Sequence, residues 1–451
     1  MEKTPSRPFL FFFPIEWVTI LSIFIISCAV HLPFLSYPNR VIFDEVHFGG
    51  FLSDYINGIC FFDIHPPLAK MMLAATGKLT GYQGDFNFSK VETKYTSNFY
   101  VPIRLCPALL CTLVSPLLTA TLILQKSSLP MAGLCGILFT FEFNAITQSR
   151  LILTDGILYF FVAFSIFITA LEERFQSDSF MLILQSLAAS FAFCTKFTAA
   201  GLFILIALSH FKILFINNKK ENWFLILCKR GIIVSIVFIL FLYTIMVIHL
   251  KLMPNKGYGD LYMQRDFRNL PMFTRVFKLL FAMYRYNSNL RIDHPYKSKW
   301  YQWPFVSYTP IYIYSDYNKF LFLFSNPIPA FFSLLGFFTG FFAKDFTCLS
   351  YSIIYLISYF PFIMVDRCVF NYHYEIPLIF GILSLCLSIS RILQKLTNAR
   401  KIEYAIAFLL AIATVACFAF WFPFIYGTEI TRDQMNKITI WKRMRSNFHL
   451  T

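Results

Sequence analysis

Long apolar runs recur along the whole chain, and they constrain its fold more than any other feature of the sequence. A helix that crosses the hydrocarbon core of a bilayer needs roughly 20 apolar residues. Eleven stretches of the sequence fit that template, at residues 15–35, 101–124, 129–148, 155–171, 179–195, 198–216, 231–250, 320–342, 346–365, 374–393 and 404–425. This pattern predicts an all-α polytopic membrane protein.

The composition supports the same class. Of the 451 residues, 57% are hydrophobic and only 14% are charged, which lies outside the range of ordinary soluble domains. The net charge of +15 does not indicate nucleic acid, because Lys and Arg gather in the short segments between apolar runs, where they fit lipid headgroups. The eleven Cys form no C-x-x-C pair, so neither a zinc site nor a redox site is implied.

The distribution of basic residues predicts an orientation. Cytosolic loops are enriched in Lys and Arg, and a cytosolic N-terminus gives these loops most of the basic clusters, namely Lys3, Arg7, Lys126, Lys219, Lys220, Lys229, Arg230, Arg391, Lys395, Arg400 and Lys401. The first apolar run is then a retained span, and eleven spans place the C-terminus in the lumen.

Two long polar segments, residues 36–100 and 251–319, fall on the luminal side in this orientation. A transporter generally keeps such loops short, whereas an enzyme that acts on a luminal polymer needs them. We therefore expect an N-terminal catalytic region over residues 1–250, a central luminal loop over 251–319 and a C-terminal transmembrane region over 320–451.

The first luminal loop carries two polar motifs. Residues 43–49 (FDEVHFG) place Asp44 beside Glu45, and two adjacent carboxylates at a membrane surface are costly to desolvate, so they form either a functional site or a solvated pair. Residues 63–68 (DIHPPL) then precede an amphipathic stretch that reaches Leu79. The double proline predicts a turn followed by a short interfacial helix, which serves either the site or lipid anchoring.

Two arginines stand at predicted luminal ends of spans. The guanidinium groups of Arg104 and Arg150 cannot be neutralised by deprotonation, so an apolar setting makes each of them a candidate to bind an anion. Snorkelling to lipid headgroups is the alternative for both. For Arg150, Glu142 and Asp155 also offer internal ion-pair partners.

Taken in order, these motifs resemble the successive signatures of the protein O-mannosyltransferase family. The resemblance extends from about residue 40 to about residue 380 and rests on the segments 43–49, 63–70, 104–108 (RLCPA), 148–155 (QSRLILTD), 294–304 (which begins HPYKSKW) and 372–377 (which begins YHY). Members of that family usually carry three β-trefoil-type repeats in the central luminal loop. Residues 251–319 are too few to hold them, so the chain resembles a compact form that lacks the repeat block.

The resemblance implies a GT-C-type glycosyltransferase in the membrane of the endoplasmic reticulum, with luminal loops that bear short amphipathic helices. Such an enzyme moves mannose from dolichyl phosphate mannose to Ser or Thr hydroxyls of acceptor proteins, with inversion at the anomeric carbon. A dimer with a related mannosyltransferase subunit is also implied.

The matching positions give roles to particular residues. Asp44 corresponds to the catalytic base, and Glu45 is expected to orient the loop or the acceptor. Arg104 is the first candidate for the donor phosphate, and the further candidates are Arg150, His65, Lys299, Arg367 and His373. Dependence on a divalent metal is undecided, because two adjacent carboxylates alone do not enclose a hard cation.

Two other classes of function remain open from the residues. Another lipid-linked-sugar transferase of the same architecture would share the acidic pair, although the motifs at 63–67 and 294–296 argue against it. A membrane transporter or scaffold is the second alternative, in which Glu142 and Asn144 would line a path through the membrane.

Overall fold

The structure is a computed structural model, and it describes residues 12–175, 179–217, 221–289, 293–365, 367–394 and 396–431. Both termini lie outside the described residues, so the predicted orientation of the two ends is not addressed. The same holds for five of the basic residues on which that orientation rests, Lys3, Arg7, Lys219, Lys220 and Lys395.

Helices make up most of the described chain. The α-helices are α1 (Pro14–His31), α2 (Glu45–Asn57), α3 (Leu68–Leu79), α4 (Tyr100–Thr112), α5 (Val114–Leu124), α6 (Leu129–Thr140), α7 (Phe143–Ser149), α8 (Asp155–Phe175), α9 (Ser179–Phe193), α10 (Gly201–Phe211), α11 (Trp223–Lys251), α12 (Met272–Asn289), α13 (Pro327–Phe342), α14 (Phe346–Tyr359), α15 (Glu375–Leu393) and α16 (Ala399–Tyr426). Short 3-10 helices are η1 (Phe197–Ala200), η3 (Tyr258–Tyr262), η4 (Phe267–Asn269), η5 (Trp300–Gln302), η6 (Phe360–Ile363) and η7 (Asn371–Tyr374), and η2 (Lys212–Asn217) is a π-helix.

Within the described residues, eight helical segments are long and apolar enough to cross a membrane, and a ninth is formed if the bent pair α6 and α7 is one span. Two shorter apolar helices, Phe180–Phe193 and Pro327–Phe342, lie at two further predicted positions. Helices therefore occupy all eleven positions expected from the sequence, and the protein is a multi-pass membrane protein. The number of helices that actually cross the bilayer stays a prediction.

Two predicted spans differ from the observed helices. Residues 320–323 belong to strand β2 (Lys319–Leu323), which pairs antiparallel with β1 (Ile311–Asp316), so the fold includes one small hairpin and α13 begins only at Pro327. The segment 129–148 is broken into α6 and α7, which meet at 54°. The break occurs because the Glu142 carboxylate caps α7, accepting the Asn144 N–H at 3.4 Å, and starts a new helix direction.

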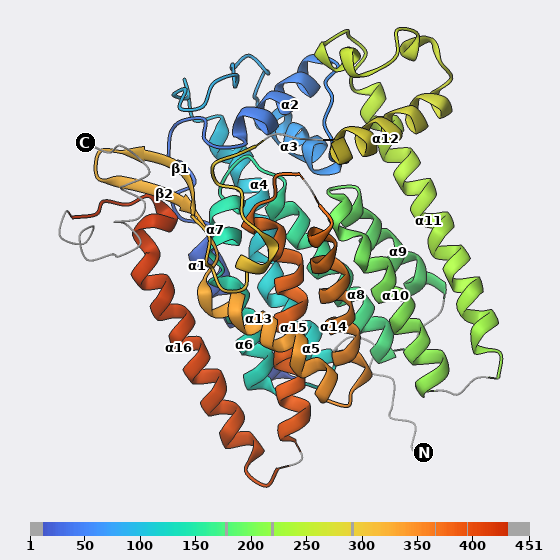
Figure 1. Cartoon of the computed structure of the whole chain (residues 1–451), viewed down its shortest axis with the longest axis vertical. Coiled ribbons are helices and arrows are strands. Elements are labelled where there is room, and N and C mark those ends of the chain that lie inside the picture. Colours follow the sequence, from blue (N-terminus) through green and yellow to red (C-terminus); the bar gives the residue numbers. More distant parts are fainter. Residues whose placement is uncertain are drawn as a thin grey trace.

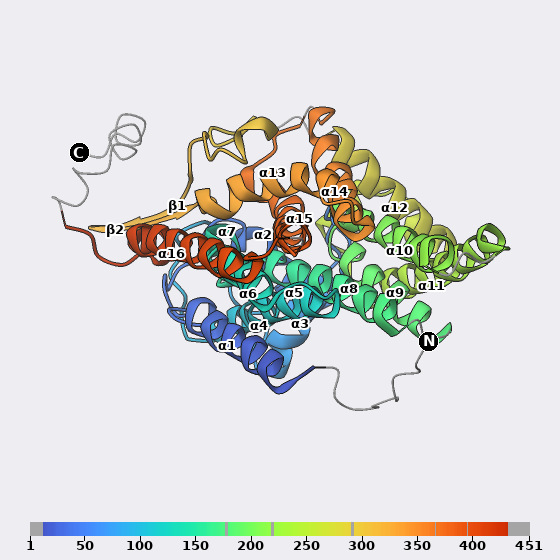
Figure 2. The same ribbon diagram turned by 90° about the horizontal axis from the view of Figure 1, so that it is seen from below.

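The helices form a layered bundle around α15. Seen from below, α15 lies between α13 and α14 on one side and α5 and α6 on the other (Figure 2). The long helices α11 and α16 stand at opposite flanks of the bundle (Figure 1), and only a few of their large apolar side chains are buried. In a membrane these two surfaces face lipid or another membrane helix.

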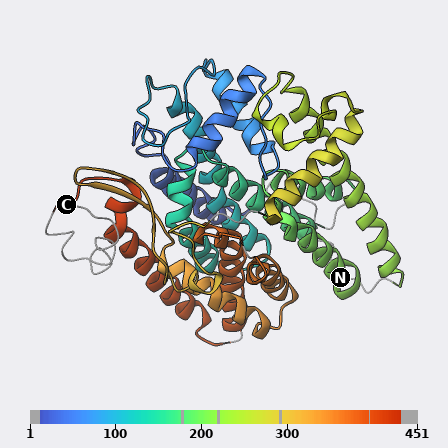
Figure 3. The same cartoon turned by 45° about the horizontal axis from the view of Figure 1, so that its top comes forward.

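The polar segments gather at one end of the bundle. Helices α2, α3 and α12 and the β-hairpin all lie toward the upper end in Figure 1, with the hairpin on the left and α12 on the right, and Figure 3 shows the α2–α3 segment beside the segment that contains α12. Helix α3 begins directly after Pro66-Pro67, as the amphipathic pattern predicted. The expected short helices in the polar loops are thus present, and they cover the end of the bundle where the cavity described below opens.

The contact between α13 and α15 depends on small residues. Gly336 and Gly340 are four residues apart on α13, and a Cβ atom at Gly336 would overlap the Gly381 carbonyl oxygen of α15. A Cβ at Gly340 would meet the Ser384 hydroxyl. Because lipid supplies no hydrophobic force between helices, such close backbone approach is a main source of their association.

We expect Gly336→Ala to destabilise the bundle by about 1–3 kcal/mol, because the added methyl group forces α13 and α15 apart. The measurement is the thermal unfolding of the detergent-solubilised protein. Gly231→Ala is the matched control, since no atom lies within 4 Å of a Cβ placed at that exposed position of α11. Equal melting temperatures for the two variants would contradict the proposed close packing.

Candidate functional site

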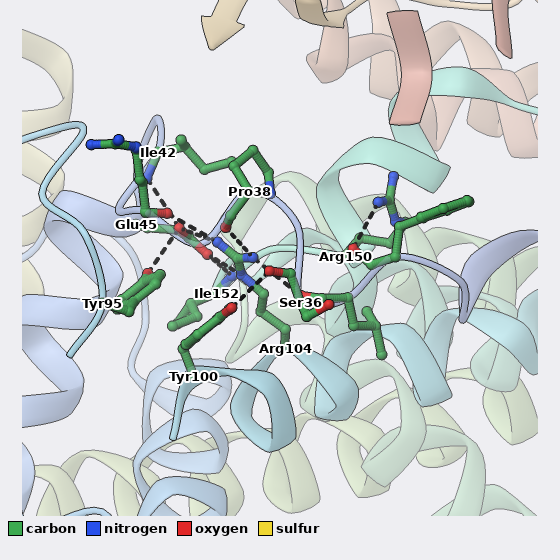
Figure 4. Close-up of polar contacts among 12 residues, drawn as sticks. Ser36, Pro38, Ile42, Glu45, Tyr95, Tyr100, Arg104, Arg150 and Ile152 are labelled. Atoms are coloured by element: carbon green, nitrogen blue, oxygen red, sulfur yellow. Dashed lines mark hydrogen bonds and ion pairs between the residues drawn. The ribbon is translucent and has the colours of Figure 1, made fainter. Parts of the chain in front are cut away.

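A buried ion pair fixes the first polar loop. Arg104 of α4 and Glu45, the first residue of α2, are both 0% exposed, and they form two bonds of 2.8 Å, from Nε to Oε1 and from Nη2 to Oε2 (Figure 4). The Glu45 carboxylate also accepts the N–H groups of Ile42 at 3.1 Å and Ile152 at 2.9 Å and the Tyr95 hydroxyl at 3.0 Å. One carboxylate thus joins α2, α4 and the segment after α7.

The guanidinium of Arg104 is fully occupied by the protein. Besides Glu45, its N–H groups reach the carbonyl oxygens of Leu35 at 3.1 Å, Pro38 at 2.9 Å and Arg40 at 3.2 Å. All five N–H donors of the side chain therefore have a partner. Arg104 therefore has no free N–H group for the donor phosphate to which the sequence assigned it, and in this structure it is the ion-pair partner of Glu45.

Arg150 is a second buried arginine that joins segments far apart in the sequence. Its guanidinium donates to the carbonyl oxygens of Pro33 at 3.0 Å, Phe34 at 3.1 Å and Ile425 at 3.2 Å, and it lies 4.4 Å from the centre of the Tyr426 ring. These contacts join the segment after α1 to the end of α16. Arg150 is not among the residues that line the cavity described below, so its assignment to the phosphate gains no support. Its ion-pair partners expected from the sequence, Glu142 and Asp155, bond elsewhere.

Asp44 is positioned by the Glu45 ion pair. It is the N-cap residue of α2 and follows Phe43, whose φ of 52° lies in the left-handed region that a bulky side chain rarely adopts. Because Glu45 holds both Ile42 N–H and Arg104, this backbone is fixed on both sides of Phe43. The adjacent carboxylates therefore point to different surroundings: Glu45 is enclosed, and Asp44 lines an open cavity.

The cavity has a volume of about 440 Å³ and lies between the first polar loop, the α9–α10 turn and the segment that leads into α15. Four of the site residues predicted from the sequence line it, Asp44, His65, Arg367 and His373. Lys299 lies instead in a neighbouring pocket that shares Arg367 and Cys368 with the cavity. Other lining residues include His47, Asp63, Gln148, Asp155, Tyr159, Lys196, Thr198, Asn287, His294 and Tyr372.

Asp44 differs from the other two carboxylates of the cavity. Asp63 forms a buried ion pair with Lys70, which also donates to the His65 carbonyl at 2.7 Å. Asp155 forms an ion pair with Lys196 at 2.7 Å. Within the described part of the chain, no hydrogen bond or ion pair engages the Asp44 carboxylate. Asp44 is consequently the carboxylate that remains available to a ligand.

Electrostatics favour a proton acceptor at this position. Burial raises the pKa of Asp44 to about 6, with Asp155 and Asp63 acting in the same direction and His47 and Lys196 opposing it. A carboxylate with such a pKa is still ionised at neutral pH and is a stronger base than an ordinary aspartate. Asp63 differs, because Lys70 and His65 outweigh the effect of burial and hold its pKa below the usual value.

Two cations and a neutral histidine complete the cavity wall. Lys196 lies 5.9 Å from the centre of the Tyr372 ring, in addition to its ion pair with Asp155. Burial lowers the pKa of Arg367, whose guanidinium has no ion-pair partner among the described residues, so an anion at its side would relieve the cost of desolvation. Burial also lowers the pKa of His65 to about 3, which leaves its ring neutral.

Lys196 was missed by the sequence reasoning, although a signal for it exists. It falls in the short connection between the predicted spans 179–195 and 198–216, which the predicted orientation places on the luminal side. A lysine in a short luminal loop departs from the positive-inside pattern. Arg150 also lies in a short predicted luminal loop, however, so this departure alone does not separate the two residues.

The residues of the cavity do not form a metal cage. The carboxylate oxygens of Glu45 accept hydrogen bonds from Arg104, Tyr95 and backbone N–H groups. The carboxylates of Asp44 and Glu45 therefore do not converge on a common point. Across the described residues, no group of three or more His, Cys, Asp or Glu side chains is arranged to hold a metal ion.

The residues expected to line a transport path lie elsewhere. Asn144 donates to the Glu375 carboxylate and to the Ser325 hydroxyl, both at 2.9 Å, and Glu142 accepts the Asn326 N–H. Neither Glu142 nor Asn144 lines the cavity. These buried groups instead form a closed network that joins α7, α13 and α15.

The fold and the site together define a class. The structure superposes with a TM-score of 0.87 on the Saccharomyces cerevisiae protein O-mannosyltransferase Pmt1-Pmt2 complex bound to the sugar donor, with 19% identity over 95% of this chain and 92% of that one. The archaeal oligosaccharyltransferase AglB from Archaeoglobus fulgidus is a more distant neighbour, with a TM-score of 0.54 and 12% identity over 97% of this chain and 60% of that one. The architecture is that of a GT-C-type membrane glycosyltransferase.

Family comparison narrows this class. The model of dolichyl-phosphate-mannose-protein mannosyltransferases matches residues 21–254, and the model of the C-terminal four-helix membrane region of protein O-mannosyltransferases matches residues 341–444. The chain therefore belongs to the dolichyl-phosphate-mannose-protein mannosyltransferase family.

Individual relatives are longer than this chain. Dolichyl-phosphate-mannose-protein mannosyltransferase 5 of Saccharomyces cerevisiae is 30% identical over 62% of this chain and 39% of its own length. Mannosyltransferase 1 of Candida albicans is 35% identical over 56% and 30%, and protein O-mannosyl-transferase 2 of Danio rerio is 30% identical over 66% and 42%. The chain thus spans less than half the length of these curated relatives.

We expect Glu45→Gln to lower stability by about 3–5 kcal/mol, because it leaves the Arg104 guanidinium buried without its counter-charge. Asp44→Asn is the matched control one residue away, and it should stay within about 0.5 kcal/mol of the parent protein, since no ion pair is lost. Thermal unfolding in detergent measures both. If the two variants melt together, the Glu45–Arg104 pair does not hold the loop.

Proposed function

We propose that this chain transfers mannose from dolichyl phosphate mannose to Ser or Thr hydroxyl groups of proteins, with inversion at the anomeric carbon. The observation that carries the proposal is the cavity itself, whose wall combines Lys196 and Arg367 with Asp44, a carboxylate that has no partner among the described residues. Family membership supports the same chemistry. The chain covers less than half the length of the relatives, so their reaction is not simply carried over to it. The reaction is proposed instead from the residues of this chain.

Asp44 is the proposed base. Its carboxylate accepts the proton of the Ser or Thr hydroxyl while the hydroxyl oxygen attacks the anomeric carbon. The bond from that carbon to the phosphate oxygen breaks on the opposite face, and dolichyl phosphate leaves with the electron pair. A phosphate group is a good leaving group, so a single positioned carboxylate suffices, in contrast to the paired carboxyls of glycosidases.

The departing phosphate requires positive charge. Arg367 and Lys196 line the cavity that Asp44 faces, and neutral His65 and His373 provide ring N–H groups beside them. Donors fixed in a partly buried site stabilise a developing anion more than water does. Arg367 and Lys196 thus take the role first assigned to Arg104, while Arg104 acts on the reaction through the position of Asp44.

The cellular setting forms part of the proposal. The basic clusters between the spans support an orientation with the cavity on the luminal side, and family membership supports the membrane of the endoplasmic reticulum, where secreted acceptor proteins pass. The partner is a related mannosyltransferase subunit, as in the Pmt1-Pmt2 complex that shares this fold.

We expect Asp44→Asn to reduce turnover by about 10²–10⁴-fold while donor binding persists, because the amide keeps the shape of the side chain but accepts no proton. Arg367→Ala should instead weaken donor binding by roughly 10–150-fold, the effect of one lost charged hydrogen bond. Membranes that contain the chain and its partner are assayed for mannose transfer to a Ser/Thr-rich peptide. Near-normal turnover of Asp44→Asn would remove Asp44 from the base role.

The pKa of Asp44 also sets a pH dependence. The carboxylate is the active form, so kcat/KM should fall about tenfold per pH unit as the pH drops below about 6 and level off above it. A pH profile of transfer from about pH 5 to pH 8 measures this. Residual activity of Asp44→Asn serves as the control, since it should lack the inflection. A flat profile for the parent protein would contradict the assignment.

A further inference from the structure

Helix α12 presents an aromatic stripe that no other described part of the chain covers. Phe273, Phe277, Phe281 and Tyr284 follow one another at spacings of four, four and three residues, so they share one face of the helix. Their exposed fractions are 55–68%. Four large aromatic side chains in such a row are not a feature of a water-exposed surface.

The other faces of α12 are also segregated. Val276, Leu279 and Met283 are buried against Met246 and Leu250 near the end of α11. The polar side chains of Thr274, Lys278 and Arg285 occupy a third face. A buried face, an exposed aromatic face and a basic polar face are typical of a helix that lies in the plane of a membrane surface.

The position of α12 places the stripe at the level of the bilayer. Helix α11 is an apolar span that ends at Lys251, and the Phe273 ring lies 6.2 Å from the ring of Tyr243, which belongs to that span. The stripe therefore continues the exposed apolar surface of α11. Figure 1 shows α12 at the upper end of α11, across its direction.

The far end of α12 reaches the cavity. Asn287, in its last turn, lines the cavity with Asp44 and Arg367, and its Oδ1 atom is buried without a hydrogen-bond partner among the described residues. An unsatisfied buried acceptor costs free energy until a donor group arrives, so a ligand hydroxyl in the cavity would find a partner there. The same helix thus connects the lipid-facing surface of α11 to the site.

We propose that α12 is an interfacial helix whose Phe273, Phe277, Phe281 and Tyr284 side chains insert into the lipid surface, and that it admits the polyprenyl chain of a lipid-linked donor to the cavity. The occupant of the stripe is lipid, because the stripe is continuous with the surface of a membrane span. Residues 272–289 lie between the two family matches, at 21–254 and 341–444, so the family models do not describe this helix. The role in donor entry rests on the proposed function, whereas insertion into lipid does not.

The first experiment measures insertion. Phe277→Trp and Tyr317→Trp place the same reporter on the stripe and on the hairpin turn, where Tyr317 is 91% exposed. Each variant is reconstituted in vesicles of phosphatidylcholine with or without bromine on the acyl chains, and the fluorescence of the parent protein is subtracted. Additional quenching by the brominated lipid for Phe277→Trp alone supports insertion. Equal quenching of the two reporters, or none at Phe277→Trp, overturns it.

The second experiment measures donor entry with the chain and its partner in membranes. The combined variant F273S, F277S and F281S should raise KM for the long-chain dolichyl donor on the order of tenfold, with kcat unchanged. KM for a short-chain, water-soluble polyprenyl phosphate mannose should not move, and Tyr317→Ser should alter neither value. Equal losses with both donors would overturn the entry role, since they would indicate a structural defect.

Failure of the proposed role of α12 in donor entry is distinguishable from failure of the proposed mannose transfer. If the parent protein transfers mannose from neither donor, the proposed function fails, and the entry role fails with it. The quenching result stands in that case, because it requires no catalysis. If the parent protein is active and the combined variant behaves like it with both donors, only the entry role is overturned.

Discussion

The Glu45–Arg104 ion pair is the interaction on which the site depends. Two opposite charges without solvent contact are costly to bury, and their cost is offset only when every donor and acceptor is used. Here the five N–H groups of Arg104 and both oxygens of Glu45 are engaged, largely with backbone of the first polar loop. These bonds hold the first polar loop in one conformation. Asp44, the residue before Glu45, is consequently fixed at the cavity wall.

This arrangement separates two tasks between adjacent carboxylates. Glu45 supplies the fixed structure and is closed to ligands, whereas Asp44 stays unpaired and has its pKa raised by burial. The other charged residues of the cavity are likewise either paired or left free. Lys70 neutralises Asp63 and Lys196 neutralises Asp155, so neither acid competes with Asp44 for a substrate proton. Arg367 remains without a described counter-ion, which leaves positive charge available for a phosphate.

The membrane supplies a second constraint. Close contact at Gly336, Gly340 and Gly381 holds α13 to α15, while the outer helices α11 and α16 offer apolar surface to lipid. Helix α12 extends that apolar surface to the end of the bundle where the cavity opens. A site for the proposed lipid-linked sugar has to meet both water and hydrocarbon, and this end of the bundle provides both polar and apolar surface.

The sequence by itself determined the membrane class, the positions of the eleven helical segments, the short helix after Pro66-Pro67 and the place of Asp44 beside Glu45, because hydrophobic length, proline stereochemistry and local motifs are properties of short stretches. Only the tertiary structure decided which charged residues face the cavity. Arg104, Arg150 and Lys196 are all cations at the ends of apolar runs, and nothing local distinguishes them. Their roles differ because partners far along the chain, from Leu35 to Ile425, consume the donors of the two arginines, while Lys196 is brought to the cavity wall beside Tyr372.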